Sequence, residues 1–353
     1  MIRDRTLLQK LAVSPNATLG EAVRTVNEGG FGLAVVQDED GKFLGILADG
    51  DIRRAILGGI TLENVLTNLY QKNPVTAAAG ATGEMCSEIM RKCQVPQLPI
   101  LDGNNFLVGL AIWSDKENDS DFEFENRFII MAGGRGRRLH PFTQDVPKAL
   151  VPINGKPMAR IIIEKAKAEG FRNFYFSINH LGDQIENEFG DGSAMGVNIS
   201  YIKEKEPLGT IGSLSLMELD DRPVIVTNCD VITEVKYSSI LRHHRDFNAS
   251  ATVCALVHQI QNPFGVLQIS KAGYLTGLEE KPIYTSYINA GIYIFERDVL
   301  VYLKRGEFND APCFIRRIME RRQDISVFPL HENWFDVGRP SDLVAVSEVQ
   351  NKE

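Results

Sequence analysis

From residue 128 onward, short apolar runs alternate with stretches in which apolar residues recur every three or four positions. The runs have the length of buried strands, and the recurring pattern is typical of helices with one apolar face. The expected strands are 128–131, 173–179, 197–203, 223–227, 251–258, 265–270 and 291–295, and the expected helices are 158–169, 182–189, 209–219 and 236–248. This order predicts an α/β fold with a doubly wound, mostly parallel, Rossmann-like sheet that binds ligands at the carboxyl ends of its strands.

The first 118 residues follow a different pattern, in which one βαβ-type unit occurs twice. The spacing from Gly45 to Asp51 in the first copy equals that from Gly109 to Asp115 in the second. Each copy has a helical segment, a strand, a turn with Asp and Gly, and a second strand. The helical segments are 18–27 and 84–92, and the strands are 32–37, 43–47, 98–101 and 106–112. The repetition predicts a module with two similar halves.

An acidic stretch separates the two patterns. Residues 115–126 (DKENDSDFEFEN) contain many acidic residues, one lysine and no apolar period, which is typical of a solvated tether. The composition then changes sharply at Phe128. We therefore expect a module at 1–118, an acidic linker at 119–127 and a second domain at 128–353.

The composition limits the class of protein. The 353 residues are 44% hydrophobic, which suits the cores of two ordinary domains. The net charge of −8 argues against a nucleic-acid partner or an anionic membrane surface. No apolar run reaches the length of a membrane span and no signal peptide is evident, so we expect a cytoplasmic protein. Its dispersed cysteines are expected to be reduced thiols, namely Cys86, Cys93, Cys229, Cys254 and Cys313.

Glycines and basic residues follow the expected strand 128–131. Residues 132–138 read AGGRGRR, so three glycines fall within four positions and the backbone can pass close to a ligand. Such a loop presents several N–H groups to one point, which suits a phosphate, and Arg138 and Lys148 add positive charge. A tight strand-to-helix turn with solvated basic residues is the alternative. The spacing fits neither the Walker pattern nor GxGxxG.

The order of these residues closely resembles the signature of the sugar-1-phosphate nucleotidyltransferases. That signature reads Gly-Gly-x-Gly-x-Arg-Leu-x-Pro-x-Thr and then Pro-Lys-x-Leu-x-Pro, and it departs here at Arg137, where threonine is usual. The resemblance implies attack of a sugar-1-phosphate on the α-phosphorus of an NTP, giving an NDP-sugar and pyrophosphate. It implies that Arg138 and the loop N–H groups hold the triphosphate and that Lys148 neutralises charge at the α-phosphate. The loop residues concerned are Ala132, Gly133, Gly134 and Gly136.

Two aspartates are candidate metal ligands. Asp230 follows the expected strand 223–227, and Asp336 lies in the segment Trp-Phe-Asp-Val-Gly. Either residue alone could be a turn or helix cap. Two carboxylates beside a phosphate loop suit octahedral Mg²⁺. The resemblance implies that Asp230 and Asp336 are the Mg²⁺ ligands, with Cys229 in place of the usual glycine.

Four residues match the sugar side of the same family. The resemblance implies that Gly265 lies under the sugar ring and that Glu280 binds a sugar hydroxyl. It further implies that Lys281 binds the sugar phosphate and that Asn289 lies at the sugar. The segment 279–282 could also be a charged turn before a proline.

The segment 204–212 matches the loop that contacts the base in this family, where Gly209 lets the base lie on the backbone. Family members commonly have Gln or Glu at the position of Glu204, facing the base edge. A carboxylate accepts hydrogen bonds only, and guanine offers two adjacent donors, so GTP is favoured. The alternative is that Glu204 points to solvent between Lys203 and Lys205, and UTP, dTTP or ATP then remain candidates.

The repeated N-terminal unit, with its aspartate at a fixed offset, resembles a tandem CBS pair. In that family the aspartate binds the ribose of an adenine nucleotide, and a Thr or Ser three residues earlier assists. Ala48 and Ile112 stand at those earlier positions. A module for packing or dimerisation is therefore as well supported as a nucleotide sensor, and a homo-oligomer is one of the possible assemblies.

The whole chain, a CBS pair fused to this transferase, also resembles the GDP-glucosamine-forming enzymes of bacterial legionaminic acid synthesis. That resemblance favours glucosamine-1-phosphate, ahead of mannose- or heptose-1-phosphate. A different class of function remains open, namely a regulatory protein whose CBS pair senses a nucleotide and whose transferase-like domain only binds. The presence of every charged residue of the motif argues for catalysis.

Overall fold

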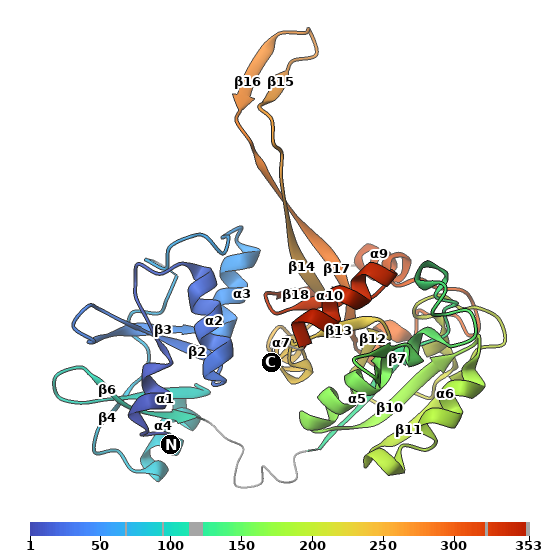
Figure 1. Cartoon of the computed structure of the whole chain (residues 1–353). Helices are drawn as coiled ribbons and strands as arrows, with labels where there is room; N and C mark the ends of the chain where they lie inside the picture. Colours follow the sequence, from blue (N-terminus) through green and yellow to red (C-terminus); the bar gives the residue numbers. More distant parts are fainter. Residues whose placement is uncertain (68, 94, 113–122, 322–323, 351–353) are drawn as a thin grey trace. The chain divides into compact units, whose positions relative to one another are not determined.

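The structure is a computed structural model that describes residues 1–67, 69–93, 95–112, 123–321 and 324–350. The chain divides into two compact units, Met1–Phe122 and Glu123–Glu353 (Figure 1). Within the described ranges, no helix combines the length and the apolar composition that a membrane span requires.

The N-terminal unit contains two similar three-stranded sheets. In each sheet the first two strands are parallel and the third is antiparallel to the second. The duplication expected from the sequence is therefore present in the fold. The first sheet contains β1 (Ala12–Val13), β2 (Leu33–Gln37) and β3 (Phe43–Ala48), and the second contains β4 (Ala77–Ala78), β5 (Gln97–Leu101) and β6 (Leu107–Ile112). The helices are α1 (Arg5–Gln9), α2 (Leu19–Gly29), α3 (Asp49–Leu57) and α4 (Gly83–Cys93).

Local chemistry fixes both ends of α2. The Thr18 hydroxyl accepts a hydrogen bond from the Glu21 N–H (3.2 Å), and the Glu21 carboxylate accepts one from the Thr18 N–H (2.7 Å). This reciprocal cap satisfies two backbone donors that the first helical turn leaves unpaired. Gly30 then ends the helix at φ +73°, a conformation that glycine adopts without strain.

Asp51, the candidate ribose ligand of the first repeat, lies in the first turn of α3. One of its carboxylate oxygens accepts a hydrogen bond from the Ala48 N–H (3.0 Å), and the other pairs with Arg54. Its carboxylate thus caps its own helix, which is a structural role. Asp115, the matching residue of the second repeat, lies outside the described residues.

The C-terminal unit is built on a seven-stranded sheet in the order β11-β10-β7-β12-β17-β14-β18. All neighbouring pairs are parallel except the two that involve β17, so one strand in seven runs against the others. The expected doubly wound, mostly parallel sheet is confirmed. The strands are β7 (Phe124–Met131), β10 (Phe171–Ile178), β11 (Asn198–Lys203), β12 (Val224–Asn228), β14 (Ala251–Gln261), β17 (Ile283–Phe295) and β18 (Ile325–Leu330).

Helices cover both faces of this sheet. Because successive side chains of a strand point to opposite faces, Phe128 and Ile130 of β7 join one buried cluster and Ile129 and Met131 join another. The first cluster includes residues of α5 (Met158–Ala168) and α7 (Tyr237–Asp246), and the second includes residues of α9 (Ala311–Glu320). Further helices are α6 (Gly182–Phe189), α8 (Arg297–Leu300) and α10 (Pro340–Gln350).

Strand β7 begins at Phe124, whereas the sequence pattern predicted a strand from Phe128. Phe124 extends the strand because its ring stacks on Phe171, with ring centroids 4.5 Å apart. Glu123, just before this strand, forms an ion pair with Arg172 of the neighbouring strand β10 (3.0 Å). Residues 124–127 of the expected linker are therefore strand, and residues 119–122 lie outside the described part of the chain.

The expected helix 209–219 is wrong. Only a short 3₁₀ turn, η4 (Gly212–Leu216), forms there. A Cβ on Gly209 would lie 2.6 Å from the Asn309 carbonyl oxygen, and a Cβ on Gly212 would lie 2.8 Å from the Glu307 carbonyl oxygen. Both glycines thus allow this segment to pack closely against another part of the backbone, which a regular helix would prevent.

The expected strand 265–270 does form in part, as β15 (Val266–Ile269), but it does not belong to the central sheet. It pairs with β16 (Leu275–Glu279) in a separate two-stranded hairpin. The outer parts of β14 and β17 extend from the sheet and lead into this hairpin (Figure 1). We call residues 256–288 the arm.

We propose that the C-terminal unit is an independent domain, because it has its own buried clusters on both faces of its sheet. A protein that begins at Glu123 is expected to fold with one cooperative thermal transition, measured by circular dichroism. Failure of this protein to fold would show that the N-terminal unit is part of the same core and that the proposed domain boundary is wrong.

Candidate active site

The glycine loop begins where β7 ends. The Ala132 N–H still bonds to the Ser177 carbonyl of β10 (2.9 Å), and the backbone then turns away from the sheet. Gly136 has φ +62°, and its carbonyl oxygen accepts a hydrogen bond from the buried Thr143 hydroxyl (2.8 Å). Apart from its two chain neighbours, no residue in the described part of the chain comes within 4 Å of a Cβ placed on Gly134. The hydrogen bond from Thr143 therefore fixes the loop at Gly136, and the loop is open to a ligand at Gly134.

Lys148 reaches the same place from the 3₁₀ turn η2 (Lys148–Leu150). Its side chain is largely buried, and its Nζ forms an ion pair with the carboxylate of Asp230. Asp230 lies two residues after the end of β12, and the N–H of the intervening Cys229 bonds to the Met131 carbonyl of β7 (3.2 Å). The carboxyl ends of two neighbouring parallel strands thus bring the lysine and the aspartate together.

Asp336 is placed beside Asp230 by a small additional sheet. β13 (Val231–Thr233) pairs with β19 (Trp334–Asp336), with Val231 opposite Asp336. The Val337 N–H also donates to the Asp230 carbonyl (2.9 Å). Burial, and next the negative charge of Asp230, raise the pKa of Asp336, whereas Lys148 and Arg138 act in the opposite direction.

Arg138 completes the cluster. It is exposed in η1 (Arg137–Leu139), and its guanidinium lies beside Gly338, where a Cβ would be 3.4 Å from Arg138 Cζ. Four predicted site residues, two cationic and two anionic, therefore meet at the carboxyl edge of the sheet next to the glycine loop. They are Arg138, Lys148, Asp230 and Asp336.

Glu204 follows β11 and lies beside the glycine loop, not in solvent. Its Oε1 accepts a hydrogen bond from the Ser177 hydroxyl, and its Oε2 accepts one from the Leu208 N–H (2.9 Å). A Cβ on Gly133 would lie 3.1 Å from Glu204 Oε1. Nothing in the sequence pattern indicated Ser177, which orients this carboxylate from the end of β10.

Gly209 has φ +80° and packs closely against Asn309 and Asp310. A Cβ at this position would also lie 2.8 Å from Asp310 Oδ1. The neighbouring Thr210 hydroxyl accepts a hydrogen bond from the Ala311 N–H at the start of α9 (2.8 Å). Close packing of the protein is thus one reason for glycine here, and its contact with a base stays a prediction.

The structure does not bring all four sugar-side residues to this cluster. Asn289 lies at the base of the arm, where its Oδ1 accepts a hydrogen bond from the Gly291 N–H (3.1 Å). Gly265 and Glu280 are neighbours, since a Cβ on Gly265 would lie 2.8 Å from Glu280 Oε2. These two residues and Lys281 lie beyond the ladder pair Gln261–Ile283, which at 3.3 Å per residue is about 20 Å farther along the arm than Asn289.

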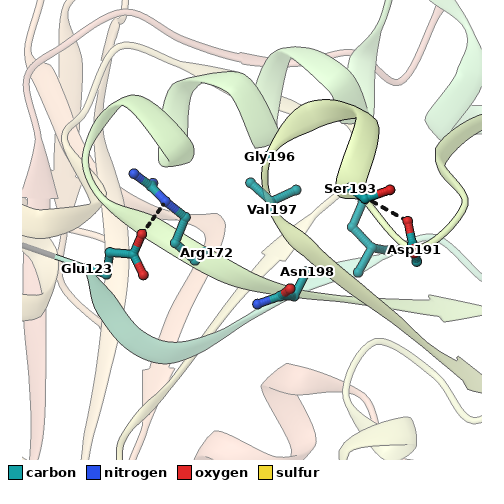
Figure 2. Close-up of a pocket in the computed structure, with 8 residues that line it drawn as sticks. Glu123, Arg172, Asp191, Ser193, Gly196, Val197 and Asn198 are labelled. Atoms are coloured by element: carbon teal, nitrogen blue, oxygen red, sulfur yellow. Dashed lines mark hydrogen bonds and ion pairs between the residues drawn. The ribbon is translucent and has the colours of Figure 1, made fainter. Parts of the chain in front are cut away.

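A surface hollow of about 560 Å³ lies elsewhere on the C-terminal unit (Figure 2). It is lined by residues such as Glu123, Arg172 and Asn198, which lie near the amino ends of β7, β10 and β11. The glycine loop lies at the opposite, carboxyl ends of these parallel strands. This hollow is therefore separate from the candidate active site.

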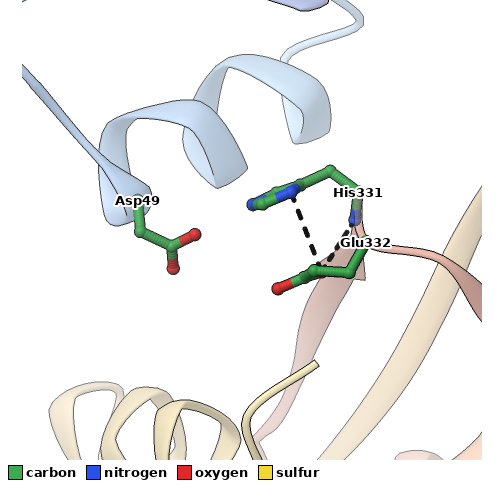
Figure 3. A group of neighbouring side chains, drawn as sticks. All are labelled: Asp49, His331 and Glu332. Carbon is green, nitrogen blue, oxygen red and sulfur yellow. Dashed lines mark hydrogen bonds and ion pairs between the residues drawn. The ribbon is translucent and has the colours of Figure 1, made fainter. Parts of the chain in front are cut away.

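Figure 3 shows His331 and Glu332, which follow β18. The His331 backbone N–H donates to Glu332 Oε2 (3.1 Å), and the His331 Nδ1 lies 3.8 Å from the same oxygen. Asp49, drawn in the same figure, belongs to the N-terminal unit, where it pairs with Arg53 (2.7 Å). Because a single imidazole and a single carboxylate meet here in the described part of the C-terminal unit, we assign them no metal.

The loop geometry leads to a stability prediction with a matched pair of glycines. Gly136→Ala is expected to lower the free energy of unfolding by about 1–3 kcal/mol, because it forces a side chain into the left-handed region. The added Cβ would also lie 3.1 Å from Thr143 Cγ2. Gly134→Ala adds the same atom into open space and is expected to cost less. Urea unfolding of both variants measures the difference, and equal costs would contradict the loop geometry.

Comparison with known proteins identifies families that match each of the two units. A family model described as "Nucleotidyl transferase" matches residues 127–353, and a CBS domain model matches residues 8–58. A mannose-1-phosphate guanyltransferase of Yarrowia lipolytica is 33% identical over 227 residues, which cover 62% of this chain and 62% of that protein. A UTP–glucose-1-phosphate uridylyltransferase of Synechocystis is 27% identical over 235 residues, covering 61% and 60%. The chain thus spans about three fifths of the length of these relatives.

Solved structures agree on the fold. A putative glucose-1-phosphate thymidylyltransferase from Bacillus anthracis, in complex with a sucrose, has a TM-score of 0.52 and is 25% identical. The similarity covers 64% of this chain and 96% of that one. HddC from Yersinia pseudotuberculosis has a TM-score of 0.50 at 23% identity, covers 64% and 99%, and supports the fold alone. The family match covers more than half of the chain, so this protein belongs to the nucleotidyl transferase family and has a CBS domain at residues 8–58.

Proposed function

We propose that the chain transfers a nucleotidyl group from an NTP to a sugar-1-phosphate and releases pyrophosphate. The observation that carries this proposal is the cluster of Arg138, Lys148, Asp230 and Asp336 beside the open glycine loop. Both substrates are anions, so their mutual repulsion opposes the reaction. A site that positions two phosphates and neutralises their charge addresses that obstacle directly.

In this mechanism a phosphate oxygen of the sugar-1-phosphate attacks the α-phosphorus in line, and the bond to the leaving pyrophosphate breaks. The N–H groups of the glycine loop and the guanidinium of Arg138 hold the triphosphate. Lys148 neutralises the charge that develops at the α-phosphate, and the ion pair with Asp230 fixes the direction of its side chain. No covalent nucleophile of the protein is required.

The carboxylates of Asp230 and Asp336 are proposed to hold Mg²⁺. Their oxygen atoms are the ligands that this ion prefers. The two groups lie close enough for Asp230 to raise the pKa of Asp336, and a cation between them would relieve that repulsion. When bound, Mg²⁺ supplies further positive charge near the α-phosphate.

We favour GTP as the nucleotide and glucosamine-1-phosphate as the sugar. Glu204 supports the base assignment, because its carboxylate lies beside the glycine loop and each oxygen has a lone pair in addition to the one its known donor uses. The guanyltransferase relative supports the base and supports mannose-1-phosphate as an alternative sugar. Heptose-1-phosphate is the other alternative. The glucosamine assignment rests on the resemblance of the whole chain to the GDP-glucosamine-forming enzymes of legionaminic acid synthesis.

A binding-only regulatory protein is the second candidate. One observation favours it: Glu280 and Lys281 lie on the arm beyond the pair Gln261–Ile283, which is about 20 Å from Asn289 by strand spacing. In that case the CBS module would be the sensor, and an adenine nucleotide would be its proposed ligand.

Pyrophosphate release from a matrix of substrates tests both candidates. The full chain is incubated with Mg²⁺, each of GTP, UTP, dTTP, ATP and CTP, and each of glucosamine-, mannose-, heptose- and glucose-1-phosphate. GTP with glucosamine-1-phosphate is expected to give the highest rate. Faster reaction with UTP or dTTP would overturn the base assignment, and release no higher than without sugar phosphate for every pair would overturn catalysis. Adding AMP or ATP to the active pair tests the CBS module.

A further inference from the structure

The loop that contains Gly209 is joined to the start of helix α9 by an exchange of hydrogen bonds. Asp310 occupies the N-cap position of α9, where an aspartate usually accepts a hydrogen bond from the first turn of its own helix. Its side chain makes no such bond within α9. Instead its Oδ1 accepts a hydrogen bond from the Thr210 N–H (3.3 Å), and the Thr210 hydroxyl accepts one from the Ala311 N–H (2.8 Å). Each segment therefore satisfies a backbone donor of the other.

The sequence explains why the Asp310 side chain turns away from its own helix. The second residue of α9 is Pro312, which has no N–H to donate, so one of the usual partners of an N-cap side chain is missing. The Ala311 N–H is one of the donors that the first turn of a helix leaves without an internal partner. A cap within α9 would leave the loop free, whereas the exchanged cap makes the loop and the start of the helix depend on each other.

Backbone hydrogen bonds strengthen the same connection. The Asn309 N–H donates to the Leu208 carbonyl (2.8 Å), and the Ile211 N–H donates to the Asn309 carbonyl (3.1 Å). The buried Asn309 side chain also donates to the Glu307 carbonyl (3.2 Å), which holds this part of the chain in place. The segment before α9 is therefore bonded to the loop on both sides of Gly209.

This connection reaches the carboxylate of Glu204, the proposed reader of the base. Leu208, whose carbonyl accepts from Asn309, donates its own N–H to Glu204 Oε2 (2.9 Å). The other end of the connection is anchored, because Ala311 and Phe314 of α9 are fully buried in the cluster on one face of the central sheet. The loop is thus tied to the sheet through α9.

We propose that Asp310 is a positioning residue for nucleotide binding. It acts through Thr210 and keeps Gly209 at φ +80°. This proposal rests on the function proposed above, in which Glu204 and Gly209 contact the base. A loop that leaves this conformation part of the time binds the nucleotide more weakly, because the apparent dissociation constant rises as the fraction of binding-competent protein falls. The sugar phosphate is bound by other segments in that proposal, so its binding is expected to stay the same.

Asp310→Ser tests this role and keeps a residue that is favourable at an N-cap. The serine hydroxyl lies closer to the backbone than the carboxylate oxygens do, so it does not reach Thr210. The dissociation constant of the full chain for GTP, measured by isothermal titration calorimetry, is expected to rise about tenfold, as for the loss of one hydrogen bond to a charged acceptor.

Two further variants are controls. Asp310→Asn keeps an oxygen acceptor for the Thr210 N–H, so its dissociation constant is expected to stay within about twofold of the wild-type value. Asp298→Ser makes the same change as Asp310→Ser in the first turn of α8, at an exposed position, and is expected to leave nucleotide binding unchanged. Circular dichroism confirms that each variant is folded.

Steady-state kinetics separates a positioning role from a general loss of structure. With pyrophosphate release as the signal, Asp310→Ser is expected to raise KM for GTP about tenfold and to leave KM for glucosamine-1-phosphate unchanged. If the substrate matrix selects another pair, the same measurements use that pair. An unchanged dissociation constant in folded Asp310→Ser would overturn the proposal. An equal rise in both KM values, or no recovery in Asp310→Asn, would also overturn it.

The binding measurement keeps this proposal separate from the proposed function. A wild type that binds the nucleotide and releases no pyrophosphate would overturn the proposed function alone, because the dissociation constants still decide the role of Asp310. A wild type that binds none of the nucleotides would overturn both.

Discussion

Asp230→Asn is expected to lower kcat about a hundredfold or more, because it removes one of two carboxylates proposed to hold Mg²⁺. The substitution keeps the volume of the side chain, so the effect reports on charge. Each factor of ten corresponds to about 1.4 kcal/mol of transition-state stabilisation. Lys148 keeps a second acidic neighbour in Asp336, and the variant is therefore expected to stay folded.

Asp221→Asn is the matched control for this substitution. Asp221 precedes β12, whereas Asp230 follows it, so the two aspartates lie at opposite ends of one strand. The Asp221 side chain is 91% exposed and lies away from the glycine loop. Its replacement is expected to leave kcat unchanged. Near-normal turnover of Asp230→Asn at saturating Mg²⁺ would rule out Asp230 as the metal ligand.

Glu204→Gln is expected to reduce the preference for GTP over UTP by roughly ten- to a hundredfold. A charge-assisted hydrogen-bond pair is worth about 1.5–3 kcal/mol, and an amide can accept only one of guanine's two donors with comparable geometry. The internal contacts survive the change. The glutamine oxygen can accept from the Leu208 N–H, and its NH₂ group can donate to the Ser177 hydroxyl.

Because those contacts survive, a change in preference would report on the base and not on the fold. The measurement is the ratio of kcat/KM for GTP and UTP with one sugar phosphate. Glu206→Gln is the control, since it makes the same change in the same loop at an exposed position. Unchanged preference in Glu204→Gln would show that another group reads the base.

The central sheet was predictable because strands of a parallel sheet are buried on both faces and appear as continuous apolar runs. The segment 209–219 misled the prediction because Leu208, Ile211 and Leu214 have helical spacing. In the structure these side chains are buried, although the backbone that carries them forms only a short 3₁₀ turn. Periodicity records which residues are buried, and it cannot distinguish a helix from a loop that buries residues at the same spacing.

The members of the candidate site could be named from sequence motifs, but the sequence pattern did not show which contacts bring them together. Arg138, Lys148 and Asp230 could be found from the glycine loop, a basic motif and a strand end. The contact of Asp336 with Asp230 depends on the β13–β19 pair, whose three-residue strands are too short to recognise from a pattern. The motif around Glu280 and Lys281 was equally clear in sequence, but alternation alone does not tell where a sheet ends and an arm begins.

The inner and outer parts of strand β17 are expected to differ in local stability. Its inner residues, Ala290–Phe295, are all buried, and most of them lie between β12 and β14. Its outer residues, Ile283–Asn289, are all exposed and pair with β14 alone. Opening the outer ladder therefore needs much less free energy than opening the inner one, and amide protons are expected to exchange accordingly. The boundary falls at Asn289, so the arm can fray and re-form up to the proposed sugar site while the central sheet stays intact.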